Sequence, residues 1–173
     1  MDKQANASTW FGRDKEKGTL GNILVKGTDA AEVTNIRPMT AAQVIQQTRY
    51  PRIDLIAADP NILDINLAIL KNKVGRQDNI LKEALKSVQG KYDVCVVDNP
   101  PDSNIPVLNG LEIIDDVVVV TLPNKFSLQG IEQLEQEIKN YNAILKLKIE
   151  IRGVLVNQFT STEGCYRVVE ELR

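Results

Sequence analysis

The sequence of 173 residues contains no histidine, only two cysteines and no long apolar run. The absence of histidine excludes acid–base catalysis by imidazole and metal sites with histidine ligands. Cys95 and Cys165 stand in unrelated segments without metal-ligand spacing, and Cys95, inside an apolar run, is expected to be a small core residue. No stretch approaches the roughly 18 apolar residues of a membrane span.

The chain also has little excess charge, with a formal net charge of -2. Bulk attraction to nucleic acid is therefore not expected, and DNA binding would need a local basic patch, because affinity follows the number of phosphates neutralised. The amino terminus lacks the basic-then-apolar layout of a signal peptide, so we expect a cytoplasmic protein. Its length, and the lack of linkers or repeats, predict that residues 1–173 form a single domain.

Apolar patterns of strand and helix alternate along most of the chain. Continuous apolar runs such as 117–120 are typical of strands covered on both faces in a parallel sheet. The predicted fold class is α/β, a three-layer sandwich with a mostly parallel sheet. Strands are expected over 53–58, 92–98, 116–122 and 149–156, and helices over 19–25 (capped by Thr19), 29–35, 62–72, 78–88, 105–114, 127–145 and 162–173, after a loop with one short helical turn over 1–18.

The helix expected over 127–145 has one apolar stripe, with residues spaced by three and four. Such a stripe packs on a sheet in the simpler interpretation, and a seam for a partner protein is the alternative. Its members are Ile131, Leu134, Ile138, Tyr141 and Leu145.

The run over 92–98 ends in a carboxylate, Asp98, which is followed by Asn99, Pro100 and Pro101. An aspartate at the carboxyl end of a buried parallel strand lies where such sheets bind ligands. There it can orient water on a Mg²⁺ ion that bridges nucleotide phosphates. The prolines would stiffen the loop. The simpler interpretation is that Asp98 only caps the next turn.

Two further segments have polar residues at suggestive places. Asn157 follows the strand over 149–156, and its amide suits the donor and acceptor edge of adenine, although an asparagine also commonly turns a chain out of a strand. The segment that holds Asp2, Gln4 and Asn6 is, by itself, a polar tail.

In combination, these segments resemble the ParA family of partition ATPases, within the deviant Walker A group that also contains MinD-like proteins. The family motif Asp-x-Asp-Pro-Gln-Gly-Asn-Ala-Ser/Thr is entered at Asp2, although Lys3 replaces the usual Pro and Ala5 the usual Gly. Asn99 replaces the usual small residue after the Walker B aspartate. The matching positions are Asp2, Gln4, Asn6, Ala7, Ser8, Trp10, Gly12, Asp98, Pro100, Pro101, Asn109, 126–130, 153–155 and 168–173.

The resemblance implies a role for each matching residue. Asp2 would activate the hydrolytic water, with Gln4 and Asn6 in the same switch I loop. Asp98 would be the Walker B carboxylate, acting on Mg²⁺ through water, and Pro100 would belong to switch II. Asn157 would lie where the wider group reads adenine.

The resemblance also implies cofactors and partners. The cofactors would be ATP and Mg²⁺, and the intact protein would form a homodimer with ATP. Its partners would be a ParB-type protein and non-specific DNA, without a membrane, so the intact protein would be associated with the nucleoid.

The phosphate-binding loop of this family, Lys-Gly-Gly-x-x-Lys-Thr, does not occur in the 173 residues, nor does any Gly-rich run that ends in Lys-Ser/Thr. That loop holds the phosphates with backbone N–H groups and a lysine. We therefore expect no appreciable ATPase activity from this chain alone. The lost strand would run beside 94–97, so we also expect bare apolar surface there.

The start within a motif favours a truncated ATPase. Two alternatives stay open. One is a non-enzymatic interaction module or decoy that keeps the fold, and the other is a MinD-like positioning ATPase.

Overall fold

The structure is a computed structural model that describes residues 5–14, 16–71, 77–100, 104–124 and 126–172. The chain divides into two compact units, Met1–Ile113 (unit 1) and Ile114–Arg173 (unit 2). No helix within the described ranges is long and apolar enough to cross a bilayer. The elements are α1 (Asn6–Trp10), α2 (Leu20–Leu24), α3 (Ala30–Thr34), α4 (Ala41–Val44), β1 (Gln46–Gln47), β2 (Asp54–Leu55), α5 (Ile62–Lys71), α6 (Ile80–Leu85), η1 (Lys86–Val88), α7 (Ile105–Leu111), β3 (Asp116–Thr121), α8 (Phe126–Leu145), β4 (Glu150–Val156) and α9 (Glu163–Glu171).

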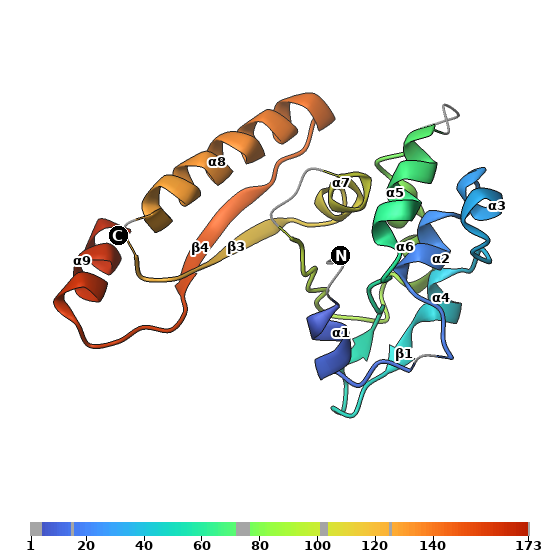
Figure 1. Ribbon diagram of the computed structural model, residues 1–173, viewed down its shortest axis with the longest axis horizontal. Coiled ribbons are helices and arrows are strands. Elements are labelled where there is room, and N and C mark those ends of the chain that lie inside the picture. Colours follow the sequence, from blue (N-terminus) through green and yellow to red (C-terminus); the bar gives the residue numbers. More distant parts are fainter. Residues whose placement is uncertain (1–4, 15, 72–76, 101–103, 125, 173) are drawn as a thin grey trace. The chain divides into compact units, whose positions relative to one another are not determined.

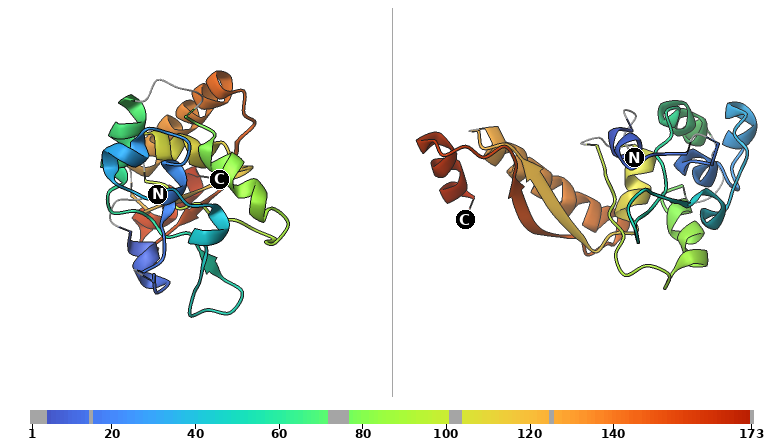
Figure 2. Two further views of the ribbon diagram at one scale, coloured as in Figure 1. Left: turned by 90° about the vertical axis from the view of Figure 1, so that its right-hand side faces the viewer. Right: turned by 90° about the horizontal axis from the view of Figure 1, so that it is seen from below.

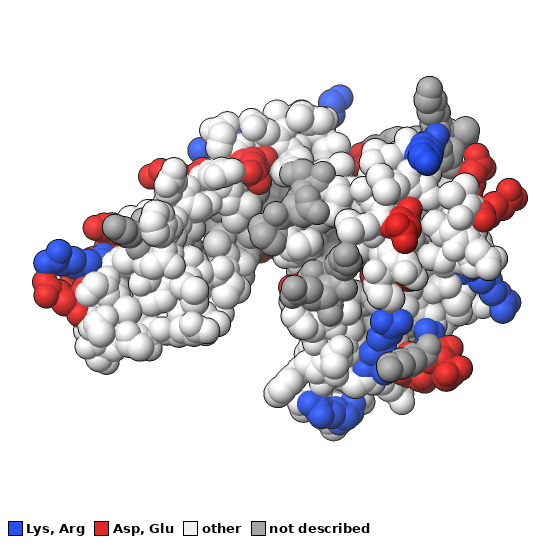
Figure 3. All heavy atoms as spheres, viewed as in Figure 1, with Lys and Arg blue, Asp and Glu red and all other residues white. Residues whose placement is uncertain are grey.

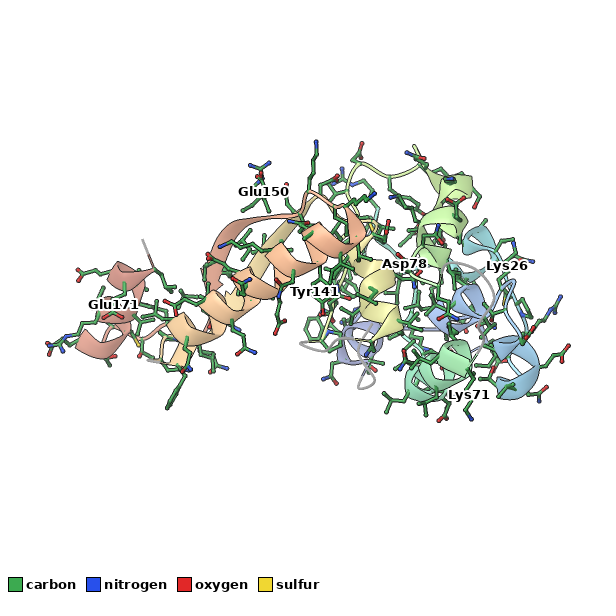
Figure 4. The ribbon with its side chains drawn as sticks, turned by 90° about the horizontal axis from the view of Figure 1, so that it is seen from above. Lys26, Lys71, Asp78, Tyr141, Glu150 and Glu171 are labelled. Atoms are coloured by element: carbon green, nitrogen blue, oxygen red, sulfur yellow. The ribbon has the colours of Figure 1, made fainter. Side chains whose placement is uncertain are left out.

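Unit 1 is mainly helical, and its helices surround an apolar core (Figure 1). Ile23 and Leu24 of α2 and Ile65 and Ile69 of α5 are fully buried at the centre of this core. Burial of one such side chain stabilises the fold by about 1.5–3 kcal/mol. The opposite sides of these helices face solvent, and Figure 4 shows Lys71, the last residue of α5, projecting outward.

The helices expected from the sequence are present with small differences at their ends. Thr19 precedes α2, and its N–H donates to Asn22 Oδ1 at 2.7 Å, so the predicted start of this helix is confirmed. The helix expected over 78–88 continues from α6 into the short 3₁₀ segment η1.

The strand expected over 53–58 is much shorter than predicted. Only β2 pairs, in an antiparallel two-residue ladder with β1. After β2, the backbone forms hydrogen bonds outside a sheet. Ala57 C=O accepts from Leu20 N–H at 2.8 Å, and Ala58 N–H donates to Ser8 Oγ at 2.9 Å. Hydrogen bonds to α2 and α1 thus replace a strand ladder.

The strand expected over 92–98 is not formed, so this prediction is wrong for the structure. The segment has no ladder partner among the described residues. Val94 and Val96 are 76% and 88% exposed. Cys95 is also exposed, so its predicted place in a core is wrong.

Unit 2 contains the parallel strand pair that the sequence predicts. β3 and β4 pair from Asp116 with Glu150 to Thr121 with Val156, with one irregularity after Val117. Figures 1 and 2 show α8 running alongside both strands. Ile138, in the middle of the apolar stripe of α8, is buried, and the other stripe residues are half-buried, which confirms that the stripe faces inward.

One face of this strand pair stays open in unit 2. Val118 and Val120 of β3 are 61% and 62% exposed, and Leu155 of β4 is 57% exposed. The residues between them are half-buried, so exposure alternates along the strands. Within the described residues of unit 2, α8 therefore covers one face of the strand pair (Figure 1), and the other face is exposed.

Candidate functional site

The segment with the predicted switch I residues leads into α1, which is attached to the body of unit 1. Ser8 is buried, and its Oγ accepts from Ala58 N–H at 2.9 Å. Ala5, before the helix, has a left-handed φ of 51°. Asn6 starts α1 and is exposed, whereas Asp2 and Gln4 lie outside the described residues.

The run that leads to Asp98 is fixed at its beginning. Tyr92 OH donates to Asp54 Oδ2 at 2.7 Å. Burial, with a smaller contribution from the hydrogen bond to Asp54, raises the pKa of Tyr92 to about 12. The run therefore leaves a defined point beside β2 and ends at the candidate site.

At the end of this run, two side-chain oxygens stand next to each other in sequence. Asp98 is exposed. Asn99 is half-buried, and its Oδ1 is buried without a hydrogen-bond partner in the described part of the chain. A buried amide oxygen without a partner is costly unless a ligand or water satisfies it. Pro100 follows, half-buried, and Pro101 lies outside the described residues.

The chain after this loop is held by α7. Asn104 caps α7 by accepting from Val107 N–H at 3.0 Å, and Ile105 N–H donates to Asn66 Oδ1 of α5, also at 3.0 Å. Both sides of the loop after Asp98 are thus anchored in unit 1. A polar residue immediately before Ile-Pro is a cap signal that the sequence analysis did not use.

Asn109 was included in the family resemblance without a role, and the structure gives it one. It is fully buried. Its Oδ1 accepts from Leu81 N–H at 2.9 Å, and its Nδ2 donates to Gln77 C=O at 2.6 Å. It therefore joins α7 to the start of α6, which is a structural function.

A second polar cluster that the sequence analysis missed lies at α2. Asp59 is buried, accepts from the Thr19 hydroxyl and accepts from Asn61 N–H at 2.8 Å. Gly21 packs against it so closely that a Cβ there would contact the Asp59 carboxylate and Ile65. Two features of the sequence belong to this cluster, the glycine in the first turn of α2 and the Asp59-Pro60 pair. Neither of them predicts that the two segments contact each other.

Asn157 belongs to unit 2, at the carboxyl end of β4 as predicted. Its N–H donates to Thr121 C=O of β3 at 2.7 Å, and its Oδ1 accepts from Gln158 N–H at 2.9 Å. Gln158 has a left-handed φ of 52°. The side-chain oxygen thus takes part in the turn that follows β4, and the adenine role of Asn157 stays a prediction.

A pocket of about 300 Å³ also lies in unit 2, where the loop after β3 meets α9. Asn157 is not among its lining residues, which are Pro123, Asn124, Gly164, Arg167, Val168 and Glu171. No pattern in the sequence predicts it.

The residues around Asp98 fit a magnesium ion in part. Mg²⁺ prefers oxygen ligands and keeps several waters, and the Asp98 carboxylate and the Asn99 amide oxygen are such donors. No cluster of three or more acidic or sulfur ligands occurs among the described residues. Water or phosphate oxygens would have to complete the coordination.

Comparison with known proteins identifies the family. A family profile described as an AAA domain matches residues 1–151. The chain belongs to this family, in its ParA-type branch. It is 28% identical to the cell division protein PomZ of Myxococcus xanthus, over 94% of this chain and 47% of that protein. It is 25% identical to the chromosome partitioning protein ParA of Myxococcus xanthus, over 100% of this chain and 58% of that protein.

Solved structures show the same α/β fold. A plasmid partition protein from Borrelia burgdorferi aligns with a TM-score of 0.72 and 20% identity, over 99% of this chain and 69% of that chain. Cobyrinic acid a,c-diamide synthase from Mycobacterium smegmatis, with bound ADP and magnesium, aligns with a TM-score of 0.78 and 21% identity, over 98% of this chain and 65% of that chain. The chain thus spans about half to two thirds of the proteins that it resembles.

Proposed function

We propose that this chain contributes the metal-side residues of the nucleotide site in a ParA-type ATPase of plasmid or chromosome partition. The observation that carries the proposal is Asp98, an exposed carboxylate at the end of the run over 92–98, in a chain that the family profile matches over residues 1–151. The two units would be parts of one ATPase domain.

Asp98 would hold a Mg²⁺ ion through water, and the Asn99 amide oxygen would accept a hydrogen bond from one of those waters. The ion would supply positive charge against the triphosphate of ATP. Asp2 would position the attacking water, with Gln4 and Asn6 in the same loop. Pro100 would hold the loop after Asp98, and Asn157 would face the adenine through its side-chain amide.

The whole protein would act as proteins of the ParA family do. It would dimerise with ATP, bind DNA non-specifically, and hydrolyse ATP when a ParB-type partner stimulates it. We place it in the cytoplasm, on the nucleoid. The 173 residues alone would be catalytically incompetent, because they contain no Gly-rich run that ends in Lys-Ser/Thr to hold the phosphates.

The test is a titration of the purified chain with Mg·ATP, together with a phosphate-release assay. We expect weak, magnesium-dependent ATP binding and no release above background. Asp98→Asn removes the magnesium dependence. The matched control is Asp93→Asn, an exposed aspartate in the same run, which keeps it. Ordinary turnover by the chain, or an Asp98→Asn variant that binds Mg·ATP like the parent, contradicts the proposal.

The likeness to PomZ favours a second candidate, a positioning ATPase of cell division. The two candidates differ in cargo rather than in chemistry. A fluorescent fusion of the whole protein distinguishes them. Foci that follow the replicated DNA indicate partition, and a cluster at the division site indicates positioning.

A further inference from the structure

An arginine–aromatic surface lies on unit 1, formed by the end of α1 and the turn between β1 and β2. Trp10 is 64% exposed. The Arg49 guanidinium lies over the Trp10 ring, 5.4 Å from its centroid, and 5.0 Å from the centroid of Tyr50. Phe11 meets Tyr50 edge to face, with the ring centroids 5.9 Å apart. These rings hold the side chain of Arg49 in place.

The turn also presents a second arginine. Ile53 N–H donates to Tyr50 C=O at 3.3 Å, which closes a turn with Pro51 and Arg52 at its centre. Arg52 has a left-handed φ of 67°, a conformation that glycine or asparagine adopts more readily. The chain therefore keeps a charged side chain at a position where the backbone favours glycine.

The charges of this turn are not neutralised locally. Within the described part of the chain, neither Arg49 nor Arg52 forms an ion pair, and both are exposed. At the lower edge of unit 1, where Figure 1 draws α1 and this turn, Figure 3 shows separate groups of Lys and Arg, one of them beside a group of Asp and Glu. The turn itself therefore presents two exposed cations, although the overall charge of the chain is -2.

From this arrangement we infer that Trp10, Arg49 and Arg52 form a binding surface for single-stranded nucleic acid. An exposed ring offers a face to an unpaired base, and base–aromatic stacking is tolerant of sequence. The guanidinium groups supply donors for the phosphates on either side. A base paired within a duplex has no free face, so a duplex would use the arginines alone.

The experiment uses the one tryptophan of the chain as a reporter. Oligothymidylate of about 12 nucleotides, within the range that one single-strand site covers, is titrated into the full chain without ATP. We expect quenching of Trp10 fluorescence. With two phosphate contacts, log K falls with log salt at a slope of about −1.4, a loss of about sevenfold between 50 and 200 mM salt.

Variants are compared by anisotropy of a labelled oligonucleotide. Trp10→Ala is expected to weaken binding by about 5- to 150-fold, the range of one lost stacking contact. Arg52→Gly removes a phosphate contact while suiting the backbone, so it should bind more weakly and stay as stable as the parent. The control is Arg37→Ala, which removes an exposed arginine without a ring contact in the described structure, and it should bind like the parent.

Three results overturn the inference. One is the absence of quenching by the oligonucleotide. Another is equal affinity for the matching duplex or for an oligoglutamate peptide, since neither offers an unpaired base. The last is unchanged binding by Trp10→Ala. Because the assay contains no ATP, these results do not depend on the proposed ATPase function.

Discussion

The two units differ in how far they bury their apolar side chains. In unit 1, Ile65 and Ile69 of α5 are fully buried, because α2, α3 and α7 pack against α5. In unit 2, Val118 and Val120 of β3 are more than half exposed. An apolar pattern therefore predicts which face of a helix or strand can be buried. Whether that face is buried depends on a second helix or strand that packs against it.

The largest expected effect tests this difference in burial directly. Ile69→Ala should lower the free energy of unfolding by about 2–5 kcal/mol, because it leaves a cavity in a close-packed core. Val118→Ala should change it by less than about 0.5 kcal/mol, because the side chain is 61% exposed. Urea unfolding followed by far-UV circular dichroism measures both. Equal losses would show that β3 is covered in solution.

The glycines give a second pair, one from each unit. A Cβ at Gly21 in α2 would contact the buried Asp59 carboxylate and come within 2.6 Å of Ile65 Cδ1, whereas a Cβ at Gly130 in α8 meets nothing within 4 Å. Gly21→Ala should therefore destabilise by about 1–3 kcal/mol. Gly130→Ala should stabilise by about 0.5–1 kcal/mol, since alanine is the better helix former.

Thermal unfolding of the two glycine variants measures these opposite signs. Stabilisation by Gly21→Ala would contradict the prediction, because the space between α2 and Asp59 would then be larger than the structure shows.

Which parts could be predicted from the sequence follows from the range of the interactions involved. Thr19 caps α2 through Asn22, three residues away, and the stripe on α8 repeats within one helix, so local pattern sufficed. The strand over 92–98 needs a neighbouring strand to exist at all. The same run of apolar residues is compatible with a paired strand or with the extended, exposed segment observed, and its own sequence cannot distinguish them.

The candidate site shows the same limit. Asp98 could be selected because it ends an apolar run, and Asn157 because it follows a strand. The tether from Ser8 to Ala58 and the anchoring of α6 by Asn109 could not be predicted, because each joins residues 28 or more positions apart. The roles predicted for Asp2 and Asp98 in one nucleotide site stay predictions, since Asp2 lies outside the described residues.

The open face of unit 2 has a consequence in solution. Val118, Val120 and Leu155 form an exposed apolar patch, and such patches promote association. We expect the chain to self-associate, and Val118→Lys with Val120→Lys to raise the Kd of association about tenfold or more, equivalent to about 1.4 kcal/mol.

Sedimentation velocity over a range of concentrations measures this association. The matched control adds the same two charges to polar, exposed positions of α8, as Gln133→Lys with Gln136→Lys. If both double variants dissociate the chain equally, net charge rather than the apolar face controls association.

The smallest expected effect concerns one polar contact in each unit. In unit 1, Tyr92 is 42% exposed, its hydroxyl donates to Asp54 and its pKa is raised to about 12. In unit 2, Arg152 and Asp116 form an exposed ion pair with a distance of 2.7 Å between Nε and Oδ1. The folded state holds the Tyr92 proton more tightly than the unfolded chain, for which the pKa is 10.0. Stability from this group is therefore complete below about pH 10 and is lost as the pH rises towards 12.

Ultraviolet difference titration of the chain against Tyr92→Phe isolates this one phenol. Asp54→Asn should lower the pKa of Tyr92 only in part, because burial contributes more to the shift than the hydrogen bond does. Asp116→Asn in unit 2 should leave the stability nearly unchanged, since exposed ion pairs contribute little. If Tyr92 titrated at its ordinary pKa, the run over 92–98 would not be anchored at β2. The contact that fixes the start of the run leading to Asp98 would then be absent in solution.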